Sequence, residues 1–238
     1  LYCGQYVEED GQEFIYVLER PARKLYKVAL DGEAPRECVL ELPLAWELEP
    51  AYMFKCGQDS CVGGNSLYDT DFFVIDLSAD KVEKFEPVFA FDGSMEEVAD
   101  ISQNMATYSS SRSRMAVAYF NLPEIDIRAS SGETVKSLFY KDFMKPEEID
   151  RYEPKEYFVG ITSTPRHIYA LYAGDDMERK KGKSLVLVFD WDGNPVCRMR
   201  IDASMSIAVD EQNGRIISIN EDDSQYVGVE YGLPEELL

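Results

Sequence analysis

The sequence motifs that carry nucleophilic catalysis are absent from this sequence. His167 is the single histidine and lies in the run Pro165–Tyr169, so any Ser–His–Asp arrangement would have to use it. The Gly-x-Ser-x-Gly turn of the α/β-hydrolases is absent from the sequence, and this argues against that class of enzyme. A lone histidine at the start of an apolar strand is more often a packing residue than a catalyst. No catalytic residue is predicted.

Metal and phosphate sites are equally poorly supported. One histidine and scattered cysteines cannot supply the usual zinc ligands, and neither Gly-rich phosphate-binding motif occurs. Three acidic runs offer oxygen ligands for calcium: Tyr68–Asp71, Gly174–Asp176 and Glu221–Asp223. None has the spacing of an EF-hand loop, and solvated turns explain all three. We predict no cofactor and no metal.

The cysteines are odd in number, so at least one is free or pairs with another chain. They are Cys3, Cys38, Cys56, Cys61 and Cys197. Cys56 and Cys61 flank a candidate hairpin at residues 57–60. That hairpin would either bring the two sulfurs into a disulfide or leave two buried thiols, and the sequence leaves both alternatives open.

The composition is that of a folded and strongly acidic protein. Asp and Glu number 45 and Lys and Arg number 24, which gives a formal net charge of −21. Nucleic-acid binding needs clustered basic residues, so we do not expect it. The charge serves solubility, with a cation or a basic partner as the alternative. No apolar run of about 18 residues is present, so no transmembrane segment is expected.

Short apolar runs with a period of two predict an all-β protein. The predicted strands are 14–18, 25–30, 38–42, 72–77, 115–120, 167–172, 185–189, 197–201, 206–209, 215–219 and 226–229. Asp-Gly pairs at Asp31–Gly32 and Asp192–Gly193 lie between strands and predict hairpins with type I′ turns. Single helical turns are expected at 93–98, 145–150 and 234–238.

The strands that begin each repeating unit fall near residues 14, 60, 114, 167 and 215, separated by 46, 54, 53 and 48 residues. A repeat of about 50 residues is typical of four-stranded propeller blades. The strands of a β-sandwich follow one another without such a repeat. Stacked blades bury sheet faces that a single unit would leave exposed. The predicted fold is therefore a β-propeller with five visible blades of four strands, forming one domain over residues 1–238.

The second half of the chain resembles a known family. The runs YFVGITSTPRHIYALYAG from Tyr157, KSLVLVFDWDGNPVCRMRID from Lys183 and SIAVDEQNGRIISINEDDSQYVGVEY to Tyr231 resemble the TolB-like six-bladed propellers of gut anaerobic bacteria. That resemblance implies a lipoprotein of the cell envelope, in the periplasm or at the cell surface. The family has six blades, so either an N-terminal blade is missing or the ring closes with five. Cys3 follows only Leu1 and Tyr2 and forms no convincing lipobox.

Propellers bind ligands where loops from several blades converge at the channel mouth, but the fold alone does not assign a function. We expect a non-catalytic binding or scaffold module, monomeric, for an unidentified protein, peptide or glycan. The alternative is a hydrolase or lyase that acts on a glycan or peptide through acidic residues at that mouth. The candidate binding residues are Tyr108, Arg114, Arg166 and His167, at strand starts. Aromatic residues could stack on a ligand, and Trp191 is expected to be exposed.

Overall fold

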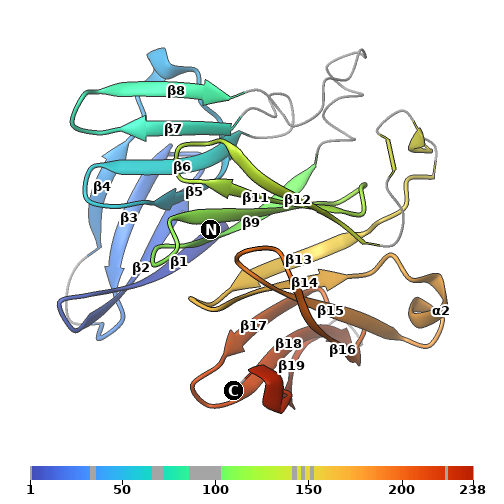
Figure 1. Ribbon diagram of the computed structural model, residues 1–238. Coiled ribbons are helices and arrows are strands. Elements are labelled where there is room, and N and C mark those ends of the chain that lie inside the picture. Colours follow the sequence, from blue (N-terminus) through green and yellow to red (C-terminus); the bar gives the residue numbers. More distant parts are fainter. Residues whose placement is uncertain are drawn as a thin grey trace. The chain divides into compact units, whose positions relative to one another are not determined.

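The computed structural model describes residues 2–32, 36–65, 72–85, 103–140, 144–145, 148–150, 153–222 and 225–237. In these residues the chain forms five antiparallel sheets and almost no helix (Figure 1). Each sheet is a meander whose consecutive strands are neighbours, and each is called a blade below. The predicted fold class is confirmed, because the chain is all-β and consists of propeller blades.

The chain divides into two compact units, and each is described by itself. Unit 1 comprises Leu1–Asp100 with Ala129–Glu133, and unit 2 comprises Ile101–Arg128 with Thr134–Leu238. The strands of unit 1 are, in blade 1, β1 (Tyr2–Glu9), β2 (Gln12–Glu19), β3 (Lys24–Ala29) and β4 (Glu37–Glu41), and in blade 2, β5 (Pro50–Lys55), β6 (Ser60–Asn65), β7 (Phe72–Asp76) and β8 (Lys81–Phe85). A 3-10 turn, η1 (Leu44–Trp46), connects the two blades.

Unit 2 holds two four-stranded blades and one three-stranded blade. Its strands are, in blade 3, β9 (Asn104–Ser109), β10 (Arg114–Tyr119), β11 (Glu124–Ala129) and β12 (Thr134–Phe139), in blade 4, β13 (Phe158–Ser163), β14 (His167–Tyr172), β15 (Lys183–Asp190) and β16 (Pro195–Asp202), and in blade 5, β17 (Ser206–Asp210), β18 (Arg215–Asp222) and β19 (Gln225–Gly232). One helical turn, α2 (Asp176–Arg179), follows β14, and η3 (Glu235–Leu237) follows β19.

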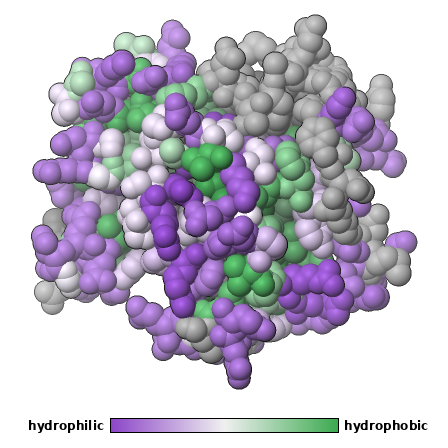
Figure 2. Space-filling view, in the orientation of Figure 1, coloured by the Kyte–Doolittle hydropathy of each residue, from purple (hydrophilic) through white to green (hydrophobic). Residues whose placement is uncertain are grey.

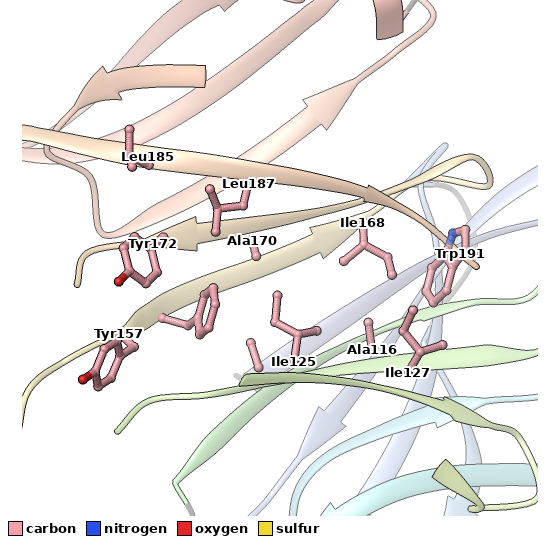
Figure 3. Packing of buried hydrophobic residues seen from close by; sticks show 12 residues of the cluster. Ala116, Ile125, Ile127, Tyr157, Ile168, Ala170, Tyr172, Leu185, Leu187 and Trp191 are labelled. Atoms are coloured by element: carbon pink, nitrogen blue, oxygen red, sulfur yellow. The ribbon is translucent and has the colours of Figure 1, made fainter. Parts of the chain in front are cut away.

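Blade 4 is covered on both faces, which explains its long apolar runs. Ile168 and Ala170 of β14, with Leu187 of β15, pack toward blade 3 in a buried cluster that includes Ile125 of β11 (Figure 3). The alternate residues of the same strands, such as Tyr169, pack toward blade 5. Strands buried on both faces are expected to be continuously apolar. Unit 1 has a separate core built on blades 1 and 2.

The repeat identified from the sequence marks the second strand of each blade. Residues 14, 60, 114, 167 and 215 fall in β2, β6, β10, β14 and β18. Each blade begins one strand earlier, so the expectation that these strands lead their units is wrong. The first strands β9 and β13 are weaker apolar signals because both contain Ser and Thr, and β13 also contains Gly.

The Asp-Gly turns differ from the expected type. At Gly32 and Gly193 only the glycine has a positive φ, +74° and +76°, whereas a type I′ turn needs positive φ at both central residues. Gly193 N donates to Asp190 O at 3.0 Å, and the β15–β16 register shifts next to this turn, as expected for a turn followed by a glycine bulge. The pair Asp10–Gly11 has φ of +52° and +77° and forms the two-residue turn between β1 and β2.

The three expected helical turns have different outcomes. The final one is confirmed as η3. The segment 93–98 lies outside the described residues, and 145–150 is described only in part. No helix among the described residues is long and apolar enough to cross a membrane. Hydrophilic side chains predominate on the face shown in Figure 2, as a net charge of −21 leads one to expect.

Candidate functional site

Three of the four sequence-predicted residues lie along one edge of unit 2. In an antiparallel meander the chain reverses at alternate ends of the sheet. The turn between the first and second strands and the turn between the third and fourth strands therefore lie at the same end of the strands. We call residues 109–114, 163–167, 190–194 and 210–215 the turn edge of unit 2. Arg114 starts β10, Arg166 lies in the turn before β14, and His167 starts β14.

Glu211 is the centre of this edge, and the sequence did not single it out. Its Oε1 accepts hydrogen bonds from Thr164 Oγ1 at 2.7 Å and Tyr169 Oη at 2.7 Å, and lies 2.8 Å from His167 Nδ1. Its Oε2 accepts from Arg166 Nε at 3.0 Å. The Glu211 side chain is only 10% exposed. The carboxylate therefore joins the β13–β14 turn of blade 4 to the β17–β18 turn of blade 5.

These contacts fix the protonation of the cluster. Burial disfavours the Glu211 carboxylate, but the hydrogen bonds from His167, Tyr169, Thr164 and Arg166 outweigh it and lower its pKa. Burial and the hydrogen bond to Glu211 raise the pKa of Tyr169 far above its ordinary value. Tyr169 thus stays protonated, and Glu211 stays ionised near neutral pH. The hydroxyls of Thr164 and Tyr169 both donate to the Glu211 carboxylate.

Arg114 and Trp191 form a second link along the turn edge. Arg114 donates through Nη1 to Trp191 O and to Asp192 Oδ1, the latter at 3.1 Å. Trp191 is 2% exposed, and its indole Nε1 donates to Thr164 O at 3.0 Å. The expectation that Trp191 is exposed is therefore wrong, because its ring packs into the cluster between blades 3 and 4 (Figure 3).

Tyr108 is separate from these groups. It lies in β9 opposite Met115 of β10 and is 9% exposed. Burial to this degree gives Tyr108 a packing role in blade 3. The structure brings together Arg166 and His167, places Arg114 at the same edge, and leaves Tyr108 in the sheet.

Arg112 is a further cation at the turn edge that sequence analysis did not select. Its side chain is exposed, and its Nε donates to Pro165 O at 3.1 Å. This bond holds the Arg112 guanidinium beside the residue that precedes Arg166. The run Ser109–Ser113 reads as an ordinary polar loop in the sequence, so only the three-dimensional contact identifies Arg112.

The first strands of unit 2 carry almost no acidic residue. β9, β13 and β17 lie side by side, and Thr107 Oγ1 of β9 lies 2.8 Å from Ser163 Oγ of β13. The three strands contain one carboxylate, Asp210, at the end of β17. Asn213 and Arg215 bind its Oδ2 at 2.7 Å and 3.0 Å. These strands do not present a pair of carboxylates.

The carboxylates with raised pKa lie elsewhere, in β11. Glu124 is 6% exposed and Asp126 is fully buried. Burial, followed by the neighbouring Asp126, raises the pKa of Glu124 to about 7. Asp126 accepts hydrogen bonds from Tyr119 Oη at 2.9 Å and from Ser137 Oγ. Burial also raises the pKa of Asp126, and both residues are buried.

The cysteines and acidic loops add no chemistry in the described residues. Cys38, Cys56, Cys61 and Cys197 are free thiols, which decides the Cys56–Cys61 alternative for this structure. Burial raises the pKa of Cys61 to about 12. Across the described part of the chain, no three His, Cys, Asp or Glu side chains are grouped to hold a metal ion. The run Tyr68–Asp71 lies outside that part.

Comparison with known proteins supports the fold. No family model and no curated protein matches the chain. Similar solved structures are β-propellers. They include a member of the DUF4221 family from Bacteroides vulgatus ATCC 8482, with a TM-score of 0.56 and 12% identity, over 92% of this chain and 75% of that one. Inactive virginiamycin B lyase from Staphylococcus aureus with quinupristin has a TM-score of 0.50 and 13% identity, over 98% and 70%.

A third similar structure is BBS1N in complex with ARL6DN, with a TM-score of 0.51 and 11% identity, over 98% of this chain and 66% of that one. The chain spans 58% of the length of the Neurospora crassa Pan2 WD40 domain. At these identities the likeness shows the fold alone.

Proposed function

We propose that this chain is a non-catalytic binding module that recognises a carboxylate-bearing peptide or glycan at the turn edge of unit 2. The observation that carries the proposal is the hydrogen bond from Arg112 Nε to Pro165 O at 3.1 Å. It holds an exposed guanidinium at the carbonyl of the residue that precedes Arg166 in the chain, and the Arg166 side chain is itself 48% exposed. Planar guanidinium groups bind carboxylates in a two-bond geometry.

The surrounding contacts support a rigid site. The Arg166 guanidinium is fixed by Glu211 Oε2 at 3.0 Å and by Leu237 O at 2.8 Å. Glu211 is already engaged by Arg166, and Asp192 is already engaged by Arg114. A ligand carboxylate would therefore meet arginines that lose little side-chain freedom on binding.

Within the part of unit 2 that the structure describes, no arrangement of groups supports the enzymatic alternative. A glycosidase needs two carboxyl groups facing a substrate at a set separation, and the adjacent first strands of unit 2 carry only Asp210. The Glu124–Asp126 pair is closed to solvent. His167 binds Glu211, and the neighbouring hydroxyls of Thr164 and Tyr169 donate to the same carboxylate. These three side chains thus connect blade 4 to Glu211 of blade 5.

The test is retention on an array of peptides and glycans that includes Asp- and Glu-rich peptides and uronate oligosaccharides, each with a neutral counterpart. We expect the wild type to retain carboxylate-bearing members, and Arg112→Gln to lose them at an unchanged melting temperature. Arg198→Gln is the matched control, because Arg198 is an exposed arginine on β16. Equal retention of neutral members, or no retention at all, would contradict the proposal. Turnover of any array member that Glu211→Gln abolishes would favour the enzyme.

A location in the periplasm or at the cell surface is proposed from the family resemblance. A single domain over residues 1–238 is proposed from the sequence repeat, and we propose that it is monomeric. Fractionation of the native host with an antibody against the chain tests the location. Recovery in the cytoplasmic fraction would contradict it. Sedimentation velocity tests the monomer, and a dimer at micromolar concentration would contradict that expectation.

A further inference from the structure

The loop between β14 and β15 and the outer strand of blade 4 carry a concentration of positive charge. Residues 179–200 contain six of the 24 basic residues and two of the 45 acidic residues, in a chain whose net charge is −21. The six are Arg179, Lys180, Lys181, Lys183, Arg198 and Arg200. The sign of the charge is reversed in this stretch, so it attracts anions that the rest of the chain repels.

This positive charge lies away from the turn edge. The loop joins the second and third strands of blade 4, so it lies at the opposite end of the strands from the turns at 163–167 and 190–194 (Figure 1). A strand of six residues such as β14 is about 20 Å long. Ala203 N donates to Gly182 O at 2.9 Å and so joins the loop to the end of β16. This end of the blade is therefore a separate surface.

Glu178, in α2, holds two of these cations together. Its side chain is only 10% exposed and forms ion pairs with Lys181 and with Arg200. Lys181 Nζ lies 3.4 Å from Glu178 Oε1, and Arg200 Nη2 donates to the same oxygen at 3.1 Å. Because both nitrogens lie within 3.4 Å of one oxygen, they are at most about 7 Å apart.

The two cations outnumber the acid that they share. The hydrogen bond from Arg200 is the main cause that lowers the pKa of Glu178, so Glu178 carries one negative charge at neutral pH. Neighbouring cations each have an acid of their own: Lys183 is paired with Asp202, and Arg179 with Glu156. One positive charge is therefore left in excess at Lys181 and Arg200.

Both cations keep donors for a further partner. The side chain of Arg200 is 60% exposed and that of Lys181 is 59% exposed. Glu178 takes the Nε and Nη2 donors of Arg200, but a guanidinium has five N–H donors, and Nη1 is not engaged by Glu178. An ammonium group has three donors, and Glu178 needs one of them. Glu178 thus orients the two cations and leaves them able to bind an anion.

The spacing of the two cations indicates the kind of anion. The oxygens of a tetrahedral phosphate or sulfate group point in several directions, so one such group can bridge two nitrogens at this separation. A carboxylate has only two oxygens, which lie in one plane. Screening limits the reach of the excess charge to about 8 Å at physiological ionic strength. A long polyanion would extend onto the acidic remainder of the chain and be repelled, which favours a small ligand.

We propose that Lys181 and Arg200, oriented by Glu178, bind the phosphate or sulfate ester group of a small ligand. Arg200 Nη1 and the Lys181 ammonium group donate to the ester oxygens, as charge-assisted hydrogen bonds. This site differs from the turn edge both in its position and in the chemistry of its ligand.

The test is isothermal titration calorimetry of the 1–238 protein with phenyl phosphate and phenyl sulfate, with benzoate and benzyl alcohol as the carboxylate and neutral counterparts. We expect saturable binding of at least one ester, about tenfold tighter than benzoate, and no binding of benzyl alcohol. Comparison of the two esters identifies whether phosphate, sulfate or either group is the ligand. Failure of both esters, or benzoate bound as tightly as the better ester, would overturn the proposal.

Variants locate the site. Arg200→Gln and Lys181→Gln should each weaken ester binding by about tenfold at an unchanged melting temperature, because each removes a charged donor. Arg198→Gln is the matched control, since Arg198 is an exposed arginine on the same strand and its loss changes the net charge equally. It should change binding by less than about twofold. Equal weakening by Arg198→Gln and Arg200→Gln would overturn the proposal, because only general attraction to positive charge would remain.

The turn edge is tested separately from this site. Arg112→Gln should leave ester binding unchanged, and loss of ester binding in that variant would overturn the proposal by placing the ester at the turn edge. A failed carboxylate array would leave these outcomes unaffected, since the array probes arginines at the opposite end of the strands.

Discussion

Replacing Glu211 by glutamine tests whether one carboxylate holds blades 4 and 5 together at their turns. The substitution keeps the size of the side chain and removes its charge. Thr164, His167 and Tyr169 each lose a charged acceptor, because their polar atoms lie within 2.8 Å of Glu211 Oε1. Arg166 loses its partner at 3.0 Å.

The expected cost follows from these contacts. A hydrogen bond to a charged group contributes about 1.5–3 kcal/mol and a neutral one about 0.5–1.5 kcal/mol, so each of the three donors loses about 1 kcal/mol. The Arg166 pair adds little, because that side chain is half-exposed and solvent screens the pair. The free energy of unfolding should fall by about 3 kcal/mol, and a chain of this size should lose about 6–12 °C of melting temperature.

Urea denaturation followed by tryptophan fluorescence measures this loss. Glu156→Gln is the matched control, because Glu156 is 42% exposed and has a single ion pair with Arg179 at 3.3 Å. It should cost less than about 1 kcal/mol. The folded-state pKa of Glu211 is lowered from its ordinary 4.5, so its contribution is present above that pH and is lost as the pH falls through the folded-state value. A Glu211→Gln variant as stable as the control at neutral pH would refute this reasoning.

Three further predictions concern backbone strain, a buried acid and the thiols. Gly193→Ala should destabilise the protein more than Gly182→Ala does. Both glycines have positive φ, but only at Gly193 would the new Cβ lie 2.7 Å from a leucine side chain. Thermal denaturation compares the two variants, and equal losses of melting temperature would contradict the packing argument. The folded-state pKa of Glu124 is raised to about 7, so the folded state holds the extra proton between about pH 4.5 and 7 and stability should fall as the pH rises across that window. Glu124→Gln should flatten this dependence in urea titrations, and an unchanged slope would place its origin elsewhere. A maleimide reagent should label the exposed Cys38 in the native protein and the buried Cys61 only after unfolding, which peptide mass analysis resolves; rapid native labelling of Cys61 would contradict its burial.

The sequence predicted the strands that carry strong apolar alternation. The range 167–172 coincides with β14, and 197–201 lies within β16, where Met199 is buried and Arg198 is exposed. The first strands β1, β5, β9 and β13 were missed. β9 (NMATYS) and β13 (FVGITS) have small and hydroxyl-bearing residues in place of a clear apolar alternation, so a pattern based on hydrophobic alternation does not detect them.

Strand β11 was missed for a different reason. Its sequence EIDIRA alternates, but Glu124, Asp126 and Arg128 occupy the face that a pattern assigns to solvent, and all three are buried. Their burial depends on hydrogen bonds and neighbouring chain segments, such as Tyr119 and Ser137 for Asp126. No local signal in the sequence encodes these contacts.

The candidate site was predicted in part. Arg166 and His167 were chosen because they start an apolar strand, and the structure places both on Glu211. Glu211 lies 44 residues beyond His167 in the chain, and nothing in its local sequence distinguishes it from the other acids. Trp191 was expected to be exposed because it precedes an Asp-Gly turn, but its ring is drawn into the core beside Thr164.

The most direct test of the central claim is hydrogen–deuterium exchange on the wild type, alone and with a carboxylate-bearing peptide or glycan retained by the array. We expect slower exchange in the peptides that contain Arg112–Arg114 and Thr164–Ile168, with Arg112→Gln abolishing the effect. Protection confined to other parts of the chain, with no change at these two turns, would contradict the assignment of the turn edge as the binding site.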